Sequence, residues 1–149
     1  MPYTDLRKGR YSEMNREYFI TTVVNNRRPV FRDFRFARLL VSNLRQWEKT
    51  QELQIQAWVI MPDHLHLLVT QTGTTDLSTM IKQLKGVSSR NLNQALNRKG
   101  TFWQPGFYDH ALRKEEDRKQ IARYIVANPL RAGLVHTIGE YPHWDSIWL

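Results

Sequence analysis

Two histidines separated by one residue are the first feature of this sequence that could do chemistry. His64, Leu65 and His66 follow a Pro-Asp step and belong to an alternating stretch, HLHLLVT. Because alternate side chains of a β-strand project from the same face, both imidazoles point one way and Leu65 the other. The pair supplies two ligands for a divalent metal, although the same spacing also occurs on solvated strand faces. The apolar run from Trp58 to Met61 favours the metal, because a buried imidazole pair without a shared ligand is costly.

A second polar group lies near the C-terminal end of the sequence. Gln120, Tyr124 and Asn128 follow one another at intervals of four residues. On a helix they would form one stripe, beside an apolar face that contains Ile121 and Ile125. Taken alone, Tyr124 also fits an amphipathic residue at the edge of a core, and Asn128 a helix cap before the following proline.

The elements that must position these residues follow from hydrophobic periodicity. Strands are expected over 18–24, 54–61, 64–70 and 107–113, and helices over 33–49 and 77–96. A last helix should begin at the acidic residues 115–117 and end before Pro129. The order β-α-β-β-α-β-α predicts an α+β fold, a ferredoxin-like split βαβ sandwich. In this fold a central antiparallel sheet carries helices on one face, plus a C-terminal helix that holds Tyr124.

The length and composition limit the classes of protein that are possible. With 149 residues and no repeat or linker, we expect one domain over residues 1–149. Lys and Arg number 22 against 14 Asp and Glu, a net charge of +8 that favours a polyanionic partner. The chain has no Cys, which excludes disulfides and thiolate chemistry. Its apolar runs are too short to cross a bilayer, and we expect a cytoplasmic, nucleoid-associated protein with no membrane partner.

Three segments carry a resemblance to a known family. MPDHLHLLV, WQPGFYDHALR and YIVANPLRAGLV resemble, in this order, motifs of the single-tyrosine HUH transposases of the insertion-sequence type, and especially the REP-associated tyrosine transposases. The resemblance covers residues 9 to about 136. It implies that Tyr124 is the nucleophile and that His64, His66 and Asn128 hold the metal. It also implies a 5′-phosphotyrosine intermediate and a free 3′-hydroxyl.

The chemistry of DNA cleavage accounts for these residue types. A phosphodiester repels nucleophiles, so a divalent cation would neutralise a non-bridging oxygen and orient the phosphate. A tyrosine hydroxyl is mostly protonated at neutral pH, so Tyr124 needs a nearby positive charge or a base when it attacks. Phosphate and water oxygens that complete the coordination favour Mg²⁺, with Mn²⁺ as a substitute, whereas two imidazoles alone would also take zinc.

Basic and aromatic residues indicate a DNA substrate. Between Asp76 and Asp109 the chain contains no acidic residue. Cations follow phosphates and aromatic rings stack on unpaired bases, which suits single-stranded or hairpin DNA. Each basic residue by itself also fits an ordinary solvated surface. The residues that we expect to bind DNA are Lys82, Lys85, Arg90, Arg27, Arg28 and Trp103.

The leading interpretation is therefore an enzyme, a metal-dependent DNA strand transferase or endonuclease that acts on hairpin-forming repeat DNA. The alternative is a non-catalytic binding module that recognises structured repeat DNA. A zinc hydrolase is disfavoured, because the sequence has no HExxH motif. We favour a monomer over a homodimer. Asp63 is either a plain turn residue, which we favour, or a hydrogen-bond partner of His64. His110 and Gln120 are further candidates for assisting residues.

Overall fold

An antiparallel sheet organises the computed structural model, which describes residues 15–113 and 118–148. Its strands have the order β4-β1-β3-β2-β5, and every neighbouring pair is antiparallel. The bounds are β1 (Glu17–Val23), β2 (Leu53–Met61), β3 (His64–Gln71), β4 (Tyr108–Ala111) and β5 (Trp144–Ser146). The units β1-α2-β2 and β3-α3-β4 interleave, so that β3 lies at the centre of the sheet, between β1 and β2. The predicted α+β class is confirmed.

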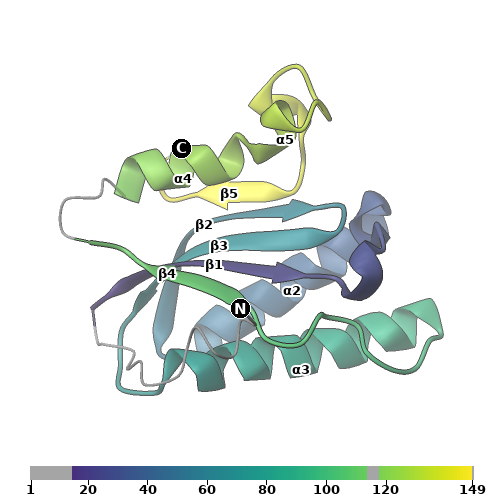
Figure 1. Ribbon diagram of the computed structural model, residues 1–149, viewed down its shortest axis with the longest axis horizontal. Coiled ribbons are helices and arrows are strands. Elements are labelled where there is room, and N and C mark those ends of the chain that lie inside the picture. Colours follow the sequence, from purple (N-terminus) through teal and green to yellow (C-terminus); the bar gives the residue numbers. More distant parts are fainter. Residues whose placement is uncertain (1–14, 114–117, 149) are drawn as a thin grey trace.

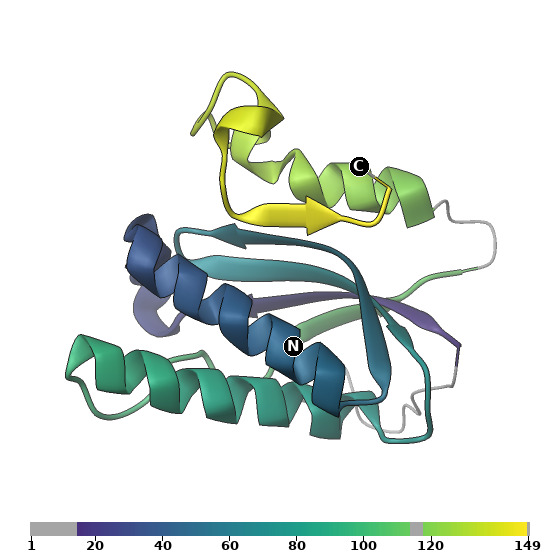
Figure 2. The same cartoon turned by 180° about the vertical axis from the view of Figure 1, so that it is seen from behind.

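The helices are divided between the two faces of the sheet (Figure 1). The long helices α2 (Phe34–Thr50) and α3 (Leu77–Leu96) cover one face, and α4 (Arg118–Val126) and the short α5 (Asn128–Arg131) lie on the other. The view from behind shows the same division (Figure 2). Three 3₁₀ turns complete the described elements: η1 (Asn25–Arg27), η2 (Val30–Arg32) and η3 (Ile138–Glu140). None of the helices in residues 15–113 and 118–148 has both the length and the apolar character needed to cross a membrane.

Alternating side chains of the strands build two separate cores. On the face of α2 and α3, the fully buried Leu65, Leu67 and Val69 of β3 join the larger core. On the opposite face, Leu68 packs with residues of α4, of which Ala122 and Ile125 are buried. The predicted apolar docking face of the last helix is therefore confirmed, and the polar positions of that helix face outward.

Local sequence features account for where most elements begin and end. Asp33 caps α2, because its carboxylate accepts a hydrogen bond of 2.9 Å from the backbone N–H of Arg35. Pro62 and Asp63 form the turn between β2 and β3, as predicted. Asp76 occupies the N-cap position of α3 but makes no capping hydrogen bond to it through its side chain. The acidic residues 115–117 that were expected to begin the last helix lie outside the described residues.

The structure differs from the predicted elements at its C-terminal end. A fifth strand, β5, pairs with the edge of β2 and was not predicted. The strand expected over 107–113 is shorter, since β4 comprises only Tyr108–Ala111. Helix α4 ends at Val126, and Asn128 begins α5 instead of continuing the stripe on α4. Pro129 explains the interruption, because a proline has no N–H to donate to the preceding turn.

Candidate active site

The two histidines lie on the central strand β3 and face α4. His64 pairs in register with Val23 and Met61, and His66 with Thr21 and Val59, so a strand lies on each side of the pair. Their ring centroids are 4.7 Å apart with an angle of 77° between the planes. The predicted projection of both imidazoles from one face is therefore confirmed, and the face is that of the smaller core.

Hydrogen bonds fix one nitrogen of each imidazole. The Nδ1 atom of His64 lies 2.6 Å from Oδ1 of Asp63, and Nδ1 of His66 lies 2.8 Å from Oγ1 of Thr21. An ionised carboxylate can only accept, so the His64 ring donates to Asp63 through Nδ1, and its Nε2 atom takes no part in this contact. With both Nδ1 atoms in use, the Nε2 atoms are the ones left for a metal. Metal-binding histidines are commonly held in this way by a carboxylate or hydroxyl partner.

The pKa values of His66 and of Asp63 are both lower than usual. Burial, the charge of His64 and that of Arg131 together lower the pKa of His66 to about 3, so this ring is neutral at physiological pH. Burial on its own would raise the pKa of Asp63, but hydrogen bonds and charges from His64 and Arg27 outweigh it and lower the pKa. His66 is thus a neutral ring close to an ionised carboxylate.

Tyr124 of α4 lies on the same face as the histidines. Phe19 of β1 lies between them, because its ring centroid is 5.4 Å from that of His66 and 6.4 Å from that of Tyr124. The guanidinium carbon of Arg131 is 3.8 Å from the centroid of the Tyr124 ring, a cation-π contact. Tyr124 is 56% exposed, so more than half of its surface is accessible in spite of these two contacts.

Asn128, the expected third ligand, follows Tyr124 by one helical turn but belongs to α5. Hydrogen bonds still span the interruption, since Ala127 N–H donates to Arg123 O and Arg131 N–H donates to Ala127 O, both at 3.0 Å. The half-buried Asn128 side chain makes no hydrogen bond to a described residue. Within the described ranges, no three His, Asp or Glu residues form a group that could hold a metal. A metal at the histidine pair therefore needs a ligand of another kind, such as an amide oxygen.

The residues that we expected to bind DNA fall into two groups. Arg27 and Arg28 lie beside the turn that carries His64, and Arg27 forms an ion pair of 3.3 Å with Asp63. Lys82 and Arg90 are exposed on α3, which covers the opposite face of the sheet (Figure 1). The structure therefore does not bring the basic surface of α3 together with the histidine pair.

Trp103 and Lys85 are engaged in contacts inside the molecule. Trp103 is only 4% exposed, its Nε1 donates to Ser88 Oγ at 2.9 Å, and its ring packs on Phe31. It has no free face for a base, which corrects the expectation that it stacks on DNA. The ammonium of Lys85 donates hydrogen bonds to the carbonyl oxygens of Gln104 and Gly106, so it holds a turn in place.

Several residues of the site were missed or undervalued in the sequence. Asp63, expected as a plain turn residue, also orients His64. Phe19 and Thr21 could have been placed on one face of their strand by alternation, but alternation does not tell which strand lies beside the histidines. The sequence did not predict the contact of Arg131 with Tyr124, because that contact depends on the path of the chain at the interruption between α4 and α5. His110 is exposed and pairs in register with Phe19, on the same face as the histidines.

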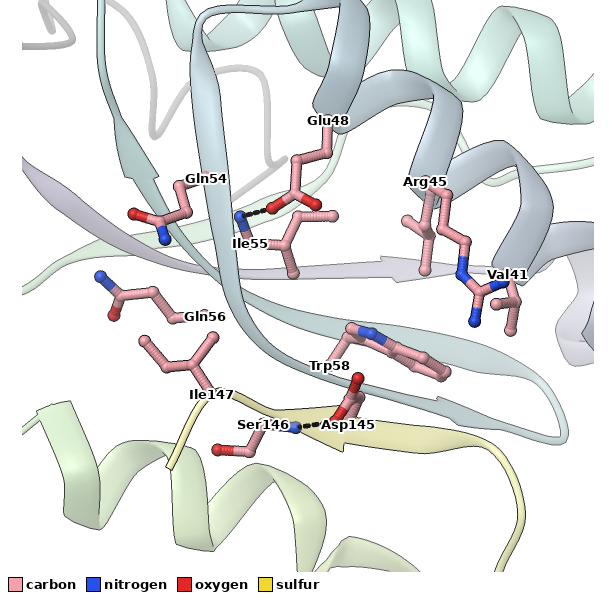
Figure 3. A pocket seen from close by; sticks show the side chains of 11 residues that line it. Val41, Arg45, Glu48, Gln54, Ile55, Gln56, Trp58, Asp145, Ser146 and Ile147 are labelled. Carbon is pink, nitrogen blue, oxygen red and sulfur yellow. Dashed lines mark hydrogen bonds between the residues drawn. The ribbon is translucent and has the colours of Figure 1, made fainter. Parts of the chain in front are cut away.

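A separate hollow lies at the β2–β5 edge of the sheet and is lined by none of the predicted site residues (Figure 3). It has a volume of about 350 Å³ and opens between α2, β2 and β5. The carboxylate of Glu48 accepts a hydrogen bond of 2.6 Å from the backbone N–H of Ile55 at its rim. Because the histidines and Tyr124 lie elsewhere, this hollow is not the candidate active site.

The fold and the arrangement of histidines and tyrosine define a transposase of the IS200-like class. The model of that family matches residues 12–128, and the chain belongs to it. Among individual proteins, the chain is similar to the REP-associated tyrosine transposase of Escherichia coli, with 28% identity over 134 residues that cover 89% of this chain and 78% of that protein. The predicted family resemblance is thus confirmed.

Two further relatives support the assignment. The ISDra2 transposase TnpA of Deinococcus radiodurans is 31% identical over 127 residues, which cover 81% of this chain and 89% of that protein. A solved structure of a REP-associated tyrosine transposase bound to a REP hairpin matches with a TM-score of 0.75 and 26% identity, over 91% of this chain and 79% of that chain.

Proposed function

We propose that this protein cuts one strand of hairpin-forming repeat DNA and transfers it through a covalent bond to Tyr124. The observation that carries the proposal is the shared face. The exposed Tyr124, with the Arg131 guanidinium on its ring, and the imidazole pair lie on either side of Phe19, which contacts both Tyr124 and His66. The similarity to a protein solved with a REP hairpin supports the choice of DNA. A pure binding module would have no need for a tyrosine beside two histidines with free Nε2 atoms.

The residues present fit a divalent cation. His64 and His66 would hold it through their Nε2 atoms, and Asn128 would supply an amide oxygen. When bound, Mg²⁺ or Mn²⁺ would supply positive charge that neutralises a non-bridging phosphate oxygen and orients the phosphate. Asp63 and Thr21 keep the two rings in the orientation that this requires.

Tyr124 performs the group transfer in this proposal. Its hydroxyl oxygen forms a bond to phosphorus while the bond from phosphorus to the 3′ oxygen breaks. The 5′-phosphate stays on Tyr124, and the leaving oxygen ends as a 3′-hydroxyl, so the proton lost by the tyrosine is balanced by the one that the leaving oxygen gains. The guanidinium of Arg131 stabilises the negative charge that develops on the tyrosine oxygen.

Strand transfer is the reverse of this step with a second DNA end. A 3′-hydroxyl attacks the phosphotyrosine, forms a new phosphodiester and releases Tyr124. One ester replaces another, so no nucleotide cofactor is required. Arg27 and Arg28 would contact the backbone near the cut, and Lys82 and Arg90 would contact phosphates farther along the DNA.

Trapping the covalent adduct tests the proposal. With Mg²⁺ or Mn²⁺ and a hairpin flanked by single strand, the wild type should form an adduct that survives SDS, and peptide mapping should locate it on Tyr124. Tyr124→Phe should bind the DNA and form no adduct, because it lacks only the hydroxyl. Tyr108→Phe is the matched control, since Tyr108 is also exposed and lies on the same face of the sheet. An adduct on Tyr108, or none on any hairpin substrate, would refute the proposal.

A further inference from the structure

An arginine-rich segment follows β1 and includes most of α2. Between Asn25 and Trp47 the sequence contains six arginines and a single acidic residue, Asp33. The segment comprises η1, η2 and most of α2. Such an excess of guanidinium groups in a short stretch favours contact with phosphates.

This segment lies against the turn that carries His64. The backbone N–H of Val24 donates to Asp63 O at 2.9 Å, and the N–H of Phe31 donates to Pro62 O at 3.0 Å. Figure 1 shows the start of α2 at the same end of the molecule as the β2–β3 turn and α5. DNA bound at the histidines would therefore pass close to the segment.

Phe34, the first residue of α2, is an exposed aromatic residue within the segment. At 58% exposure it is the most exposed large hydrophobic side chain of the described residues. Its ring lies 5.4 Å from that of the buried His143, which in turn lies 5.4 Å from the ring of Tyr141. The Tyr141 hydroxyl donates a hydrogen bond to the carbonyl of Ile60. Phe34 is thus supported from behind by a fixed pair of rings and leaves its outer side to solvent.

The charges around Phe34 are not equally free. Arg35 is held by Asp33 through hydrogen bonds of 3.2 and 2.8 Å. Arg32 is exposed and Arg38 half-buried, and neither has a carboxylate partner within the described part of the chain. Two uncompensated guanidinium groups therefore flank the exposed ring in sequence.

We propose that Phe34 stacks on an unpaired base of the DNA strand next to the cleavage site, while Arg32 and Arg38 contact the phosphates on either side. The inference rests on the proposed function for the substrate, which it narrows to DNA with a single-stranded flank. An aromatic ring can stack only on a base that has left the duplex, and it does so with little sequence preference. We call Phe34, Arg32 and Arg38 the stacking platform. It would bind DNA preferentially where a hairpin stem ends and single strand begins.

A coupling experiment between protein and DNA tests the platform. Each unpaired flank position is replaced in turn by an abasic nucleotide, and affinity is measured in chelator so that nothing is cut. In the wild type, one position should lower the affinity about tenfold. In Phe34→Ala the same abasic replacement should have no further effect, because the base has already lost its partner. Phe34→Trp should retain the effect and Phe34→Leu should lose it.

Controls separate stacking from damage to the fold. Ile147→Ala removes a side chain of similar exposure, 56%, from another surface and should leave the affinity unchanged. A hairpin without flanks should bind all Phe34 variants equally. Two results would refute the platform. One is that abasic replacement lowers the affinity of the wild type and of Phe34→Ala by the same factor. The other is that Phe34→Ala lowers the affinity for the hairpin without flanks as much as for the flanked hairpin.

The platform and the proposed chemistry can fail separately. Affinity in chelator measures the platform, and adduct formation by the wild type measures the chemistry, so the two readouts are independent. Coupling at Phe34 without any adduct in the wild type would refute the cleavage chemistry and retain the platform. An adduct without coupling would retain the chemistry and refute the platform. A preference for anionic vesicles over flanked DNA would also refute it.

Discussion

The two faces of the sheet share the strand β3 but are built for different purposes. On one face, Leu65, Leu67 and Val69 are fully buried beneath helices of 17 and 20 residues. On the other, His64 and His66 keep partial access to solvent beside α4, which the structure describes over Arg118–Val126. Consecutive residues of one strand thus belong alternately to a sealed core and to an open polar site.

This difference shows how a small domain can hold the histidine pair of its candidate active site in a fixed orientation. The buried face supplies most of the apolar burial and fixes the strand, and the polar face uses that rigidity to orient two imidazoles. Mutations on the two faces should therefore separate stability from chemistry, and the following tests are ordered from the largest expected effect to the smallest.

Removing either histidine should abolish the chemistry and leave the fold. We expect His64→Ala and His66→Ala to lower DNA cleavage more than about hundredfold, because each deletes a proposed metal ligand. Thermal melting should show a folded protein, since little buried apolar area is lost. Chelation of the wild type with EDTA should reproduce the loss. Full cleavage in either variant, or in chelator, would assign the pair a structural role.

Truncating Leu65, the residue between the two histidines, should lower stability and leave DNA cleavage unchanged. Leu65→Ala should lower the free energy of unfolding by about 2–5 kcal/mol, because it leaves a cavity in the larger core. At low temperature, where the variant stays folded, its cleavage rate should be close to that of the wild type. Denaturant titration and single-turnover cleavage measure the two quantities. A stable variant that cleaves poorly would contradict the division between the faces.

The partner of His64 should affect metal binding more than stability. Asp63→Ala should raise the metal concentration for half-maximal cleavage by about 10- to 100-fold, because the His64 ring loses the acceptor that orients it. Arg27→Ala is the control: it removes the other partner of the same carboxylate, and an exposed ion pair contributes at most about 1 kcal/mol. Equal metal dependence in both variants would show that Asp63 is only a turn residue.

The cation on Tyr124 should act on the rate of adduct formation. We expect Arg131→Gln to slow the adduct about tenfold at saturating DNA and metal, because a charge near the reacting oxygen is lost. Arg131→Lys should be intermediate, since it keeps the charge without the planar group. Arg118→Gln on the same face alters only an exposed ion pair with Glu17 and should not change the rate.

The smallest effect concerns the basic surface of α3. If DNA extends to that surface, Arg90→Gln should reduce the slope of log affinity against log salt by about one. Lys85→Gln should leave the slope unchanged and lower the melting temperature, because its ammonium holds the turn at Gln104 and Gly106. Unchanged slopes in Arg90→Gln and Lys82→Gln would confine the DNA to the end of the molecule that carries His64.

The sequence was informative where periodicity and local chemistry agree. The alternation around His64 predicted the shared face of the imidazoles, and the helical spacing predicted the docking of Ile125. Contacts that depend on the path of the chain were not accessible, because β5 is only three residues long and Arg131 reaches Tyr124 through a break at Pro129. Trp103 shows the reverse limit: an aromatic residue among basic residues suggested a nucleic-acid contact, but a buried hydrogen bond to Ser88 holds it in the core.

The short strand β5 should affect the tendency of this protein to aggregate at high concentration. It covers only Ala57–Val59 of β2, and farther along that edge Glu48 takes the backbone N–H of Ile55 (Figure 3). An uncovered strand edge is a template on which another sheet can grow. By covering part of this edge, β5 should reduce pairing between the sheets of two copies. A fusion or truncation that displaces β5 should therefore make the protein aggregate more readily through this edge.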